Sequence, residues 1–387
     1  MKNTFENNVL TIYPEGKIDT ANAEQVGKEI ETIRNAHPDG QLVLDLDELK
    51  YISSAGLRQI LKLKKKESDL KIINCSSEIY EIFEMTGFAE MMDIEKGYRR
   101  ISVEGCEKIG EGSNGIVYRL NADTIIKVYK NSDALDDIKR ERELARKALV
   151  LGINTAIPFD VVRVGDKYGS VFEMLSAKSI TKWIISDPDN KDEYIRVFAD
   201  LLKEIHHTEV KDGSLPDARK TALGWADWLE DHIPEKTYRK LHSLIEGVPE
   251  SDMMIHGDYH SNNVHYDKEE AILIDMDTLS VGDPIFEFAS IYLAYQGYGI
   301  LDHHVVEEFL KLDWDTAAYI LNKLVEMYYD DRDEAQRAEI MEKAKVVGFT
   351  RMLRRTIKRT PENKELIDYT RKQLIDLVDR TDSLHIE

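Results

Sequence analysis

The sequence predicts two domains of mixed helix and strand: an α/β domain, followed by a larger α+β domain that ends in a mostly helical region. The first observation is the length of 387 residues, which exceeds what one compact core usually holds. The second is a change of pattern along the chain. Short apolar runs alternate with helical stretches from residue 9 to about residue 94, whereas strands come first after residue 106 and helices dominate beyond residue 180.

The elements of the first domain follow from its periodicity. Val26, Ile30 and Ile33 recur at helical spacing, with Asp19 or Thr20 available as a cap. Apolar runs bounded by polar residues predict strands at 9–13, 42–46 and 71–74, and helical spacing predicts helices at 21–33, 55–66 and 78–85.

A polar, charged stretch before residue 105 marks the expected boundary. We place the first domain at 1–98, a linker at 99–105 and the second domain at 106–387. Within the second domain, a strand-rich lobe is predicted for about 106–173 and a helical lobe for about 176–387. The strand-rich lobe has one predicted helix, at 136–151.

Composition limits the partners and the compartment. The formal net charge of -21 argues against binding to nucleic acid or to an anionic membrane surface, although solubility alone also explains an acidic surface. Cys75 and Cys106 are the only cysteines, so neither a disulfide framework nor a zinc site is indicated. No secretory signal and no apolar run of about 18 residues is evident. We therefore expect a cytoplasmic protein.

A glycine-rich turn opens the second domain. Gly110, Gly112 and Gly115 lie between two apolar stretches, which favours a hairpin whose backbone could approach phosphate groups closely. Such glycines are also common in ordinary turns, so this alternative stays open.

Two charged residues follow this hairpin at positions where an isolated charge would be costly. Lys127 lies within a β-branched strand, where pairing with nucleotide phosphates would explain an ammonium; a solvent-facing lysine on an edge strand is the alternative. Glu141 shares the inward face of the next helix with Leu144 and Ala145, so we select it as the carboxylate partner of Lys127. It could instead belong to a solvated run of charges.

The strongest pattern is a set of carboxylates and an amide in the helical lobe. Asp258 is followed five residues later by Asn263, and Asp275 ends an apolar strand. Phosphoryl transfer requires a carboxylate to deprotonate a hydroxyl, and oxygen ligands to hold magnesium on the phosphates. These residues predict an ATP- and Mg²⁺-dependent phosphotransferase.

With these motifs, residues 106–387 resemble the aminoglycoside phosphotransferase and choline kinase family, whose fold is that of protein kinases. The resemblance implies ATP and Mg²⁺ as cofactors. By motif position it implies the following roles: Asp258 as catalytic base, Asn263 and Asp275 as magnesium ligands, Lys127 as the phosphate-binding lysine, Glu141 as its ion-pair partner, and His256 as the structural histidine of the catalytic loop. It also places the hinge that meets the adenine at 172–175, with Glu173 and Leu175 as binding residues.

The acceptor is expected to be the hydroxyl of a small molecule. Only five residues separate Asp277 from Asp283, which leaves no room for the segment that receives a peptide in protein kinases. Tyr328, Tyr329, Asp330 and Asp331 could line a pocket for a cationic acceptor, and a solvated acidic face explains them equally well. His206 and His207 end a helix and are expected to be packing or capping residues.

The first domain, 1–98, resembles the STAS domain of anti-sigma-factor antagonists. A strand ends in carboxylates and is followed by Ser53 and Ser54 at a helix start, where an anion would be favoured, although either serine could be an ordinary cap. The resemblance implies an anti-sigma-factor-like protein partner and makes Ser54 the phosphorylated residue by motif position. The aspartate that precedes this serine in the family is replaced here by Ser53.

The main hypothesis is therefore a small-molecule kinase fused to a STAS regulatory module. A second is a signalling kinase that phosphorylates Ser54 within its own chain or in another, which mass spectrometry after incubation with ATP would detect. A third is a non-catalytic nucleotide-binding scaffold.

Overall fold

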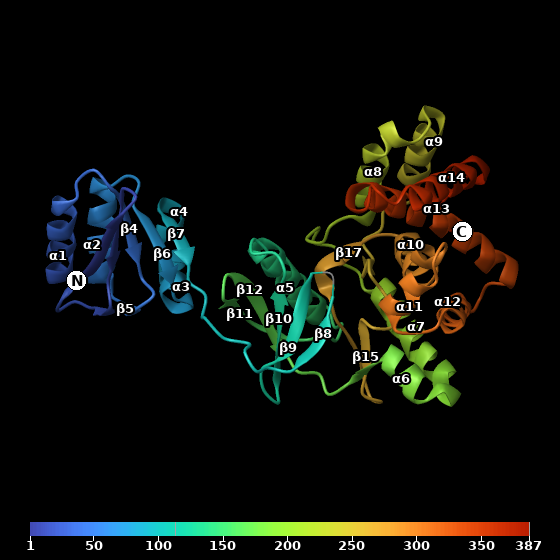
Figure 1. The fold of residues 1–387 in the computed structure, drawn as a ribbon, viewed down its shortest axis with the longest axis horizontal. Helices are drawn as coiled ribbons and strands as arrows, with labels where there is room; N and C mark the ends of the chain where they lie inside the picture. The colour runs from blue at the N-terminus through green and yellow to red at the C-terminus, as the bar shows by residue number, and fades with distance from the viewer. Residues whose placement is uncertain (113, 387) are drawn as a thin grey trace. The chain divides into compact units, whose positions relative to one another are not determined.

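The computed structural model describes residues 1–112 and 114–386, and these fall into two compact units. The first comprises Met1–Glu104 with Val161–Gly169, and the second comprises Gly105–Asp160 with the chain from Ser170 onward. Each unit has its own fold (Figure 1). Within the first unit, Arg163 joins the connecting segment by backbone hydrogen bonds: its amide donates to Arg99 O and its carbonyl accepts from Ile101 N, both at 2.9 Å.

A five-stranded sheet in the order β1-β2-β4-β6-β7 forms the centre of the first unit. Strands β1 and β2 form an antiparallel hairpin, whereas the pairs from β2 to β7 are parallel. The strands of this unit are β1 (Lys2–Glu6), β2 (Val9–Tyr13), β3 (Gly16–Ile18), β4 (Gln41–Asp45), β5 (Leu49–Ile52), β6 (Lys71–Cys75) and β7 (Asp93–Lys96).

Four helices complete the first unit, and α1 packs beside α2 (Figure 1). They are α1 (Ala23–Ala36), α2 (Ser54–Lys66), α3 (Ser77–Met85) and α4 (Phe88–Met91). Leu10 and Ile12 of β2, Leu42 and Leu44 of β4 and Ile72 of β6 are almost completely buried. Since alternate residues of a strand point to the same side of the sheet, this pattern places one core face along three neighbouring strands.

The second unit begins with a strand-rich lobe, which we call the N-lobe. Its sheet has the order β11-β12-β10-β9-β8, with antiparallel pairing between β8 and β9 and between β9 and β10. The elements of this lobe are β8 (Lys108–Glu111), β9 (Gly115–Arg119), β10 (Thr124–Tyr129), α5 (Leu135–Val150), β11 (Pro158–Val164) and β12 (Lys167–Glu173). The part of β11 and β12 within Val161–Gly169 is grouped with the first unit. The mixed sheets and the helical region after them confirm the predicted fold class.

The rest of the second unit is a helical lobe, which we call the C-lobe. Its α-helices are α6 (Ile180–Ser186), α7 (Lys191–His207), α8 (Ala218–Trp228), α9 (Glu235–Glu246), α10 (Pro284–Tyr295), α11 (His304–Leu310), α12 (Trp314–Tyr328), α13 (Glu334–Arg359) and α14 (Lys364–Arg380). All residues of α10 after its first proline are buried, and α13 packs along it, so these two helices form the centre of the lobe. In the part of the chain that the structure describes, no helix combines the length and apolar character needed to cross a membrane.

Short strands and turns of the C-lobe hold the segments that carry the predicted chemistry. The short strands are β13 (Lys178–Ser179), β14 (Met254–Ile255), β15 (Val264–Tyr266), β16 (Ala271–Leu273) and β17 (Ser280–Val281). The 3₁₀ turns are η1 (Pro188–Asn190), η2 (Glu230–His232), η3 (Met276–Thr278) and η4 (Gly297–Gly299). Strand β14 pairs with β17 and β15 with β16, so the loop from 256 to 263 is anchored at both ends.

Candidate active site

Three charged side chains from three elements meet at one point between the two lobes. The ammonium of Lys127, on β10, lies 2.9 Å from Glu141 Oε1 on α5 and 2.8 Å from Asp275 Oδ1, which follows β16. Tyr129, two residues further along β10, donates its hydroxyl hydrogen to Glu141 Oε2. The structure therefore brings together the lysine and the glutamate that sequence periodicity had paired, and adds Asp275.

Burial and neighbouring charges shift the pKa values of this cluster in opposite directions. Burial alone would lower the pKa of Lys127, but the carboxylates of Asp275 and Glu141 outweigh it and raise that pKa above its usual value. Burial would likewise raise the pKa of Asp275, whereas the ammonium of Lys127 brings it below its usual value. Lys127 and Asp275 therefore stabilise each other in their charged forms.

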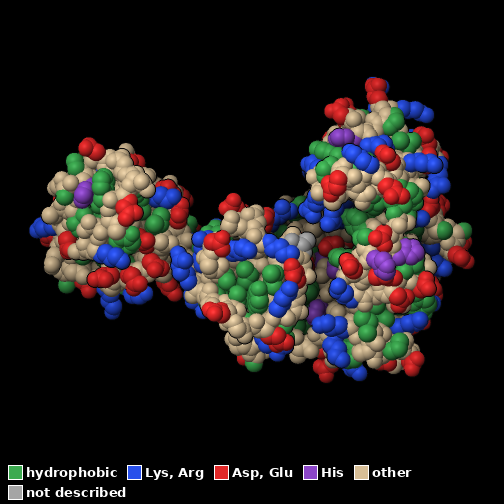
Figure 2. Space-filling model, viewed as in Figure 1, with side chains coloured by type: hydrophobic (Ala, Val, Ile, Leu, Met, Phe, Trp, Pro, Cys, Tyr) green, Lys and Arg blue, Asp and Glu red, His purple; other side chains and the backbone are tan. Residues whose placement is uncertain are grey.

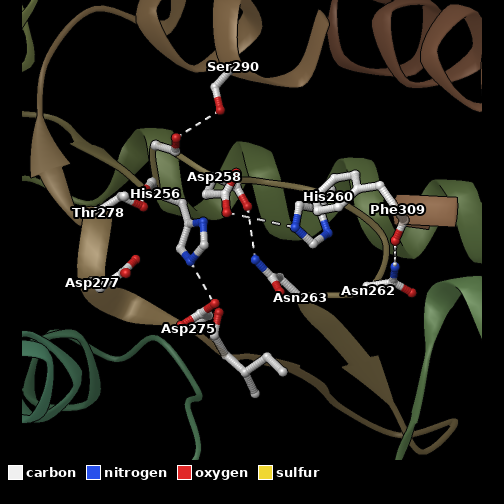
Figure 3. A network of polar contacts seen from close by, with 12 residues as sticks. His256, Asp258, His260, Asn262, Asn263, Asp275, Asp277, Thr278, Ser290 and Phe309 are labelled. Carbon is white, nitrogen blue, oxygen red and sulfur yellow. Dashed lines mark hydrogen bonds and ion pairs between the residues drawn. The ribbon is translucent and has the colours of Figure 1, made fainter. Parts of the chain in front are cut away.

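The loop from 256 to 263 is held by its own polar contacts (Figure 3). Asn263 Nδ2 donates to the backbone carbonyl of Asp258 at 3.0 Å, and His260 Nε2 lies 3.8 Å from Asp258 Oδ2. Gly257, between His256 and Asp258, has a φ of 80°, and a Cβ there would lie 2.8 Å from Thr278 O. This position therefore requires glycine, and the fixed loop backbone sets the direction of the Asp258 side chain.

His256 connects this loop to the strand that ends at Asp275. Its ring is fully buried and its Nε2 lies 3.2 Å from Ile274 O, while the Ile274 amide donates to Asn263 O at 2.9 Å. Asp275 itself has a left-handed backbone, with a φ of 65°. His256 and the β15–β16 pair therefore place the side chains of residues 258, 263 and 275 in one region of the site (Figure 3).

A buried carboxylate beneath the loop was not among the predicted site residues. Glu287 of α10 is fully buried and accepts hydrogen bonds from the backbone amides of His256 and Gly257. His206 Nε2 lies 3.7 Å from Glu287 Oε2, and His206 Nδ1 is hydrogen-bonded to the hydroxyl of Tyr328 at 2.7 Å. Burial would raise the pKa of Glu287, but His206 and the backbone amide lower it. A carboxylate in the first turn of an otherwise apolar helix was the sequence feature that could have identified Glu287. Its partners lie far away in the chain, so the sequence does not show what it binds.

Tyr328, Tyr329 and Asp330, named above as candidates for a pocket lining, each contact another residue of the C-lobe. Tyr329 is buried against Phe288, and Tyr328 contacts His206. Asp330 forms an ion pair with Lys203 at 2.8 Å. These residues therefore have partners within the C-lobe.

The three glycines of the hairpin differ in the space around them. A Cβ on Gly115 would lie 2.7 Å from Val128 O, so close packing of β9 on β10 accounts for this glycine. A Cβ on Gly112 would meet nothing within 4 Å, and one on Gly110 would meet only Val117 at 3.8 Å. The first two glycines therefore leave open space, as close approach of a ligand requires.

The predicted hinge, residues 172–175, comprises the last two residues of β12 and the two residues that follow it. The Glu173 amide donates to Ile157 O at 3.1 Å and the Glu173 carboxylate accepts from the Ile157 amide at 2.9 Å. Met174 N donates to Asp123 O at 2.8 Å. The Leu175 amide donates to no backbone carbonyl of residues 1–112 or 114–386. It is therefore the hinge donor that stays available for a ligand.

A cavity of about 370 Å³ opens beside the charged cluster. Glu141, Tyr129 and Asp277 contribute to its lining, and Asn114 donates to Asp277 Oδ2 at 3.3 Å. Burial, Asp275 and Glu141 raise the pKa of Asp277 to about 7. Neither Asp258 nor Asn263 lines this cavity, so the cavity lies beside Glu141 and Asp277 and does not include the loop from 256 to 263.

The donor atoms at the site suit magnesium bound to a nucleotide. No group of three His, Cys, Asp or Glu residues in the described chain could enclose a metal ion. The Asp275 carboxylate and the Asn263 amide oxygen are hard oxygen donors, and Mg²⁺ is commonly held by one or two such protein ligands together with phosphates and water. The residues present therefore fit a metal that arrives with its nucleotide.

The two serines of the first unit have different positions. Ser53 is the N-cap of α2, and its Oγ accepts from the Gly56 amide at 3.3 Å. Ser54 is the first residue of the helix and is exposed. The capping alternative therefore applies to Ser53 and leaves the hydroxyl of Ser54 accessible.

Comparison with known proteins finds a match for each of the two parts of the chain. The model of the phosphotransferase enzyme family matches residues 105–320, and that of the STAS domain matches residues 1–101. BtrV of Bordetella bronchiseptica, assigned as an anti-sigma factor antagonist, is 33% identical over 84 residues, which are 21% of this chain and 72% of BtrV. The anti-sigma-B factor antagonist of Listeria monocytogenes is 27% identical over 90 residues, 22% of this chain and 78% of that protein.

Among solved structures, a thermostable mutant of aminoglycoside phosphotransferase APH(4)-Ia, in ternary complex with ADP and hygromycin B, superposes with a TM-score of 0.51. It is 13% identical, and the match covers 73% of this chain and 97% of that one, so it shows a shared fold. The chain thus belongs to the phosphotransferase enzyme family and carries a STAS domain on the amino-terminal side of its kinase-like domain.

Proposed function

We propose that this protein is an ATP- and Mg²⁺-dependent phosphotransferase that acts on the hydroxyl of a small molecule, with the STAS domain as a protein-binding regulatory module. The observation that carries the proposal is the contact of Lys127 with both Glu141 and Asp275, beside a loop that presents Asp258 and Asn263. In a kinase-like fold, phosphoryl transfer depends on positioning and on charge rather than on covalent chemistry by the protein.

Each residue then has a defined task. The Lys127 ammonium, oriented by Glu141, opposes the negative charge of the nucleotide phosphates. Asp258 accepts the proton of the acceptor hydroxyl as its oxygen bonds to the γ-phosphorus and the bond to the leaving ADP oxygen breaks. Asn263 and Asp275 would hold the metal ion, which neutralises charge on the phosphates when it is bound.

An assay of ADP release from the full chain tests this function. We expect ADP formation to require both Mg²⁺ and a hydroxylated acceptor, and to stop when a chelator removes the metal. Aminoglycosides, amino sugars, choline-like alcohols, nucleosides and sugar phosphates form the acceptor panel. A thermal-shift series with ATP and Mg²⁺ runs beside it, because a ligand at 100 times its Kd stabilises the folded state by about 2.7 kcal/mol. Binding of ATP without turnover for any acceptor would favour a scaffold and contradict the proposal.

The proposed partner of the STAS domain is an anti-sigma-type protein, by resemblance to the antagonists matched above. We expect such a partner to co-elute with the full chain and its Ser54→Ala variant, but not with Ser54→Glu, because a charge at the exposed first residue of α2 changes the surface presented. A negative charge at a helix start is compatible with folding, so an unchanged thermal midpoint serves as the control. Co-elution that is insensitive to Ser54→Glu would exclude this surface.

A further inference from the structure

Four positively charged side chains form a row on α13, which we call the cation stripe. The residues are Arg351, Arg354, Arg355 and Lys358. Their spacing of three and four residues places them on one face of the helix. Residues 351–359 include five basic and no acidic residues, in a chain whose net charge is -21. The stripe is therefore a local reversal of the charge of the protein.

The stripe has no carboxylate partner. Elsewhere in the C-lobe, Arg219 pairs with Glu250 and Lys345 pairs with Glu342. By contrast, none of the four stripe residues forms an ion pair with any residue in 1–112 or 114–386. The Nε of Arg354 is buried and has no hydrogen-bond partner there. Arg355 and Lys358 are exposed, so their positive charges face solvent without a neutralising carboxylate in the described chain.

Aromatic rings from α8 and from η4 flank the stripe, and the η4 ring is that of Tyr298, 5.2 Å from the guanidinium carbon of Arg355. The guanidinium carbon of Arg351 lies 5.5 Å from the ring centre of Trp225, and that of Arg354 lies 5.9 Å from Trp228, both on α8. Lys358 Nζ lies 4.8 Å from the Trp228 ring. Arg355 Nη1 also donates to the hydroxyl of Tyr298 at 3.2 Å. The aromatic contacts orient the cations, and the remaining N–H groups of the stripe can bind an anion.

The stripe begins at the catalytic loop. Arg351 Nη1 donates to the carbonyl of Gly257 at 3.0 Å, and Gly257 immediately precedes Asp258. Ser290 donates to the same carbonyl at 2.7 Å, so Arg351 and α10 hold one peptide group together. Figure 2 shows Lys and Arg side chains gathered beside the hollow between the N-lobe and the C-lobe. A ligand whose hydroxyl reaches Asp258 would therefore lie near the start of the cation stripe.

We propose that the phosphoryl acceptor of this enzyme carries an anionic group, a phosphate or a carboxylate, which the cation stripe binds while a hydroxyl of the same molecule faces Asp258. This inference rests on the proposed phosphotransferase function and specifies its substrate class. Arginine forks match phosphate and carboxylate oxygens in pairs, whereas the protonated amines of aminoglycosides would be repelled. The reaction is the transfer already described: the acceptor oxygen bonds to the γ-phosphorus, ADP leaves, and Asp258 takes the proton.

Binding measurements on the full chain test this proposal without turnover. Ribose 5-phosphate is compared with ribose and gluconate with glucose, so that the two pairs separate phosphate from carboxylate recognition, and hygromycin B represents the cationic class. Tryptophan fluorescence is the readout, because Trp225 and Trp228 contact the stripe. We expect only anionic members to change the emission. Saturation with ADP and Mg²⁺ should leave this response in place.

Substitutions assign the response to the stripe. The double variant Arg354→Gln/Arg355→Gln should weaken anion affinity about tenfold or more, which corresponds to the loss of about one charge-assisted hydrogen bond. Arg196→Gln is the matched control, since Arg196 is an exposed arginine on α7. An unchanged thermal midpoint shows that the double variant folds.

Four results would overturn the proposal. The first two are that neutral or cationic compounds bind as well as anionic ones, and that no anionic compound is preferred over its neutral counterpart. The third is an unchanged anion affinity in the double variant. The fourth is displacement of the anion by ADP, which would assign the stripe to the nucleotide. Transfer to neutral or cationic acceptors alone would reject this inference and keep the proposed function. Anion binding at the stripe without transfer to any acceptor would reject the function instead.

Discussion

Substitution of Asp258 by asparagine is expected to lower kcat by about 10²- to 10⁴-fold, the usual contribution of a general base. Asparagine has nearly the same shape and preserves the loop, whose geometry depends on backbone contacts such as that from Asn263 Nδ2 to residue 258 O. It cannot accept the proton of the hydroxyl. Steady-state ADP release at saturating acceptor measures the loss, and nucleotide affinity should remain unchanged.

Asp376→Asn on α14 is the matched control, because Asp376 is exposed and far along the chain from the catalytic loop. This control should retain wild-type kcat. If Asp258→Asn kept full transfer activity, the assignment of the base would be wrong even though the ion-pair cluster at Lys127 would remain.

Replacing Glu287 with alanine is expected to reduce the free energy of unfolding by about 2–6 kcal/mol, because two backbone amides lose their acceptor at a cost of about 1–3 kcal/mol each. The change leaves the amides of His256 and Gly257 without their acceptor and removes the carboxylate beside His206. Denaturant unfolding of the full chain, resolved into its separate transitions, measures the effect. Glu308→Ala, at an exposed position of α11, should stay within about 0.5 kcal/mol of wild type.

The pH dependence of stability gives the Glu287 prediction a second readout. The pKa of Glu287 in the folded protein lies below its ordinary value of 4.5. The carboxylate therefore contributes stability that is fully present above 4.5 and is lost as pH falls through the lower, folded pKa. Glu287→Gln should lack this acid-sensitive part. An identical loss of stability in acid for wild type and Glu287→Gln would show that the buried carboxylate is not its source.

Much of the fold could be predicted because its elements carry local signals. The helices expected at 55–66 and 136–151 correspond to Ser54–Lys66 and Leu135–Val150, since apolar spacing fixes a helix to within a residue or two. Strand β1 was not predicted. Its residues Lys2–Glu6 are mostly exposed and lack an apolar alternation, so the strand depends on its pairing with β2.

Some features of the candidate site could also be predicted from local sequence, and others could not. Glu141 was selected from the inward face of one helix, and this face is buried in the structure. The contact of Asp275 with Lys127 spans 148 residues, and no local pattern reports it. Glu287 with His206, and the cation stripe with the tryptophans of α8, likewise depend on helices that meet only after folding. Periodicity predicts which side of an element faces inward, but not which distant element it faces.

The left-handed backbone at Asp275 subjects one position to two separate requirements. The conformation is unfavourable for β-branched side chains and favours Gly, Asn or Asp. The electrostatics of Lys127 require a carboxylate. Glycine meets only the first condition, whereas aspartate is both enriched in this conformation and able to pair with the ammonium of Lys127. The turn after β16 thereby restricts the identity of this residue before any ligand does.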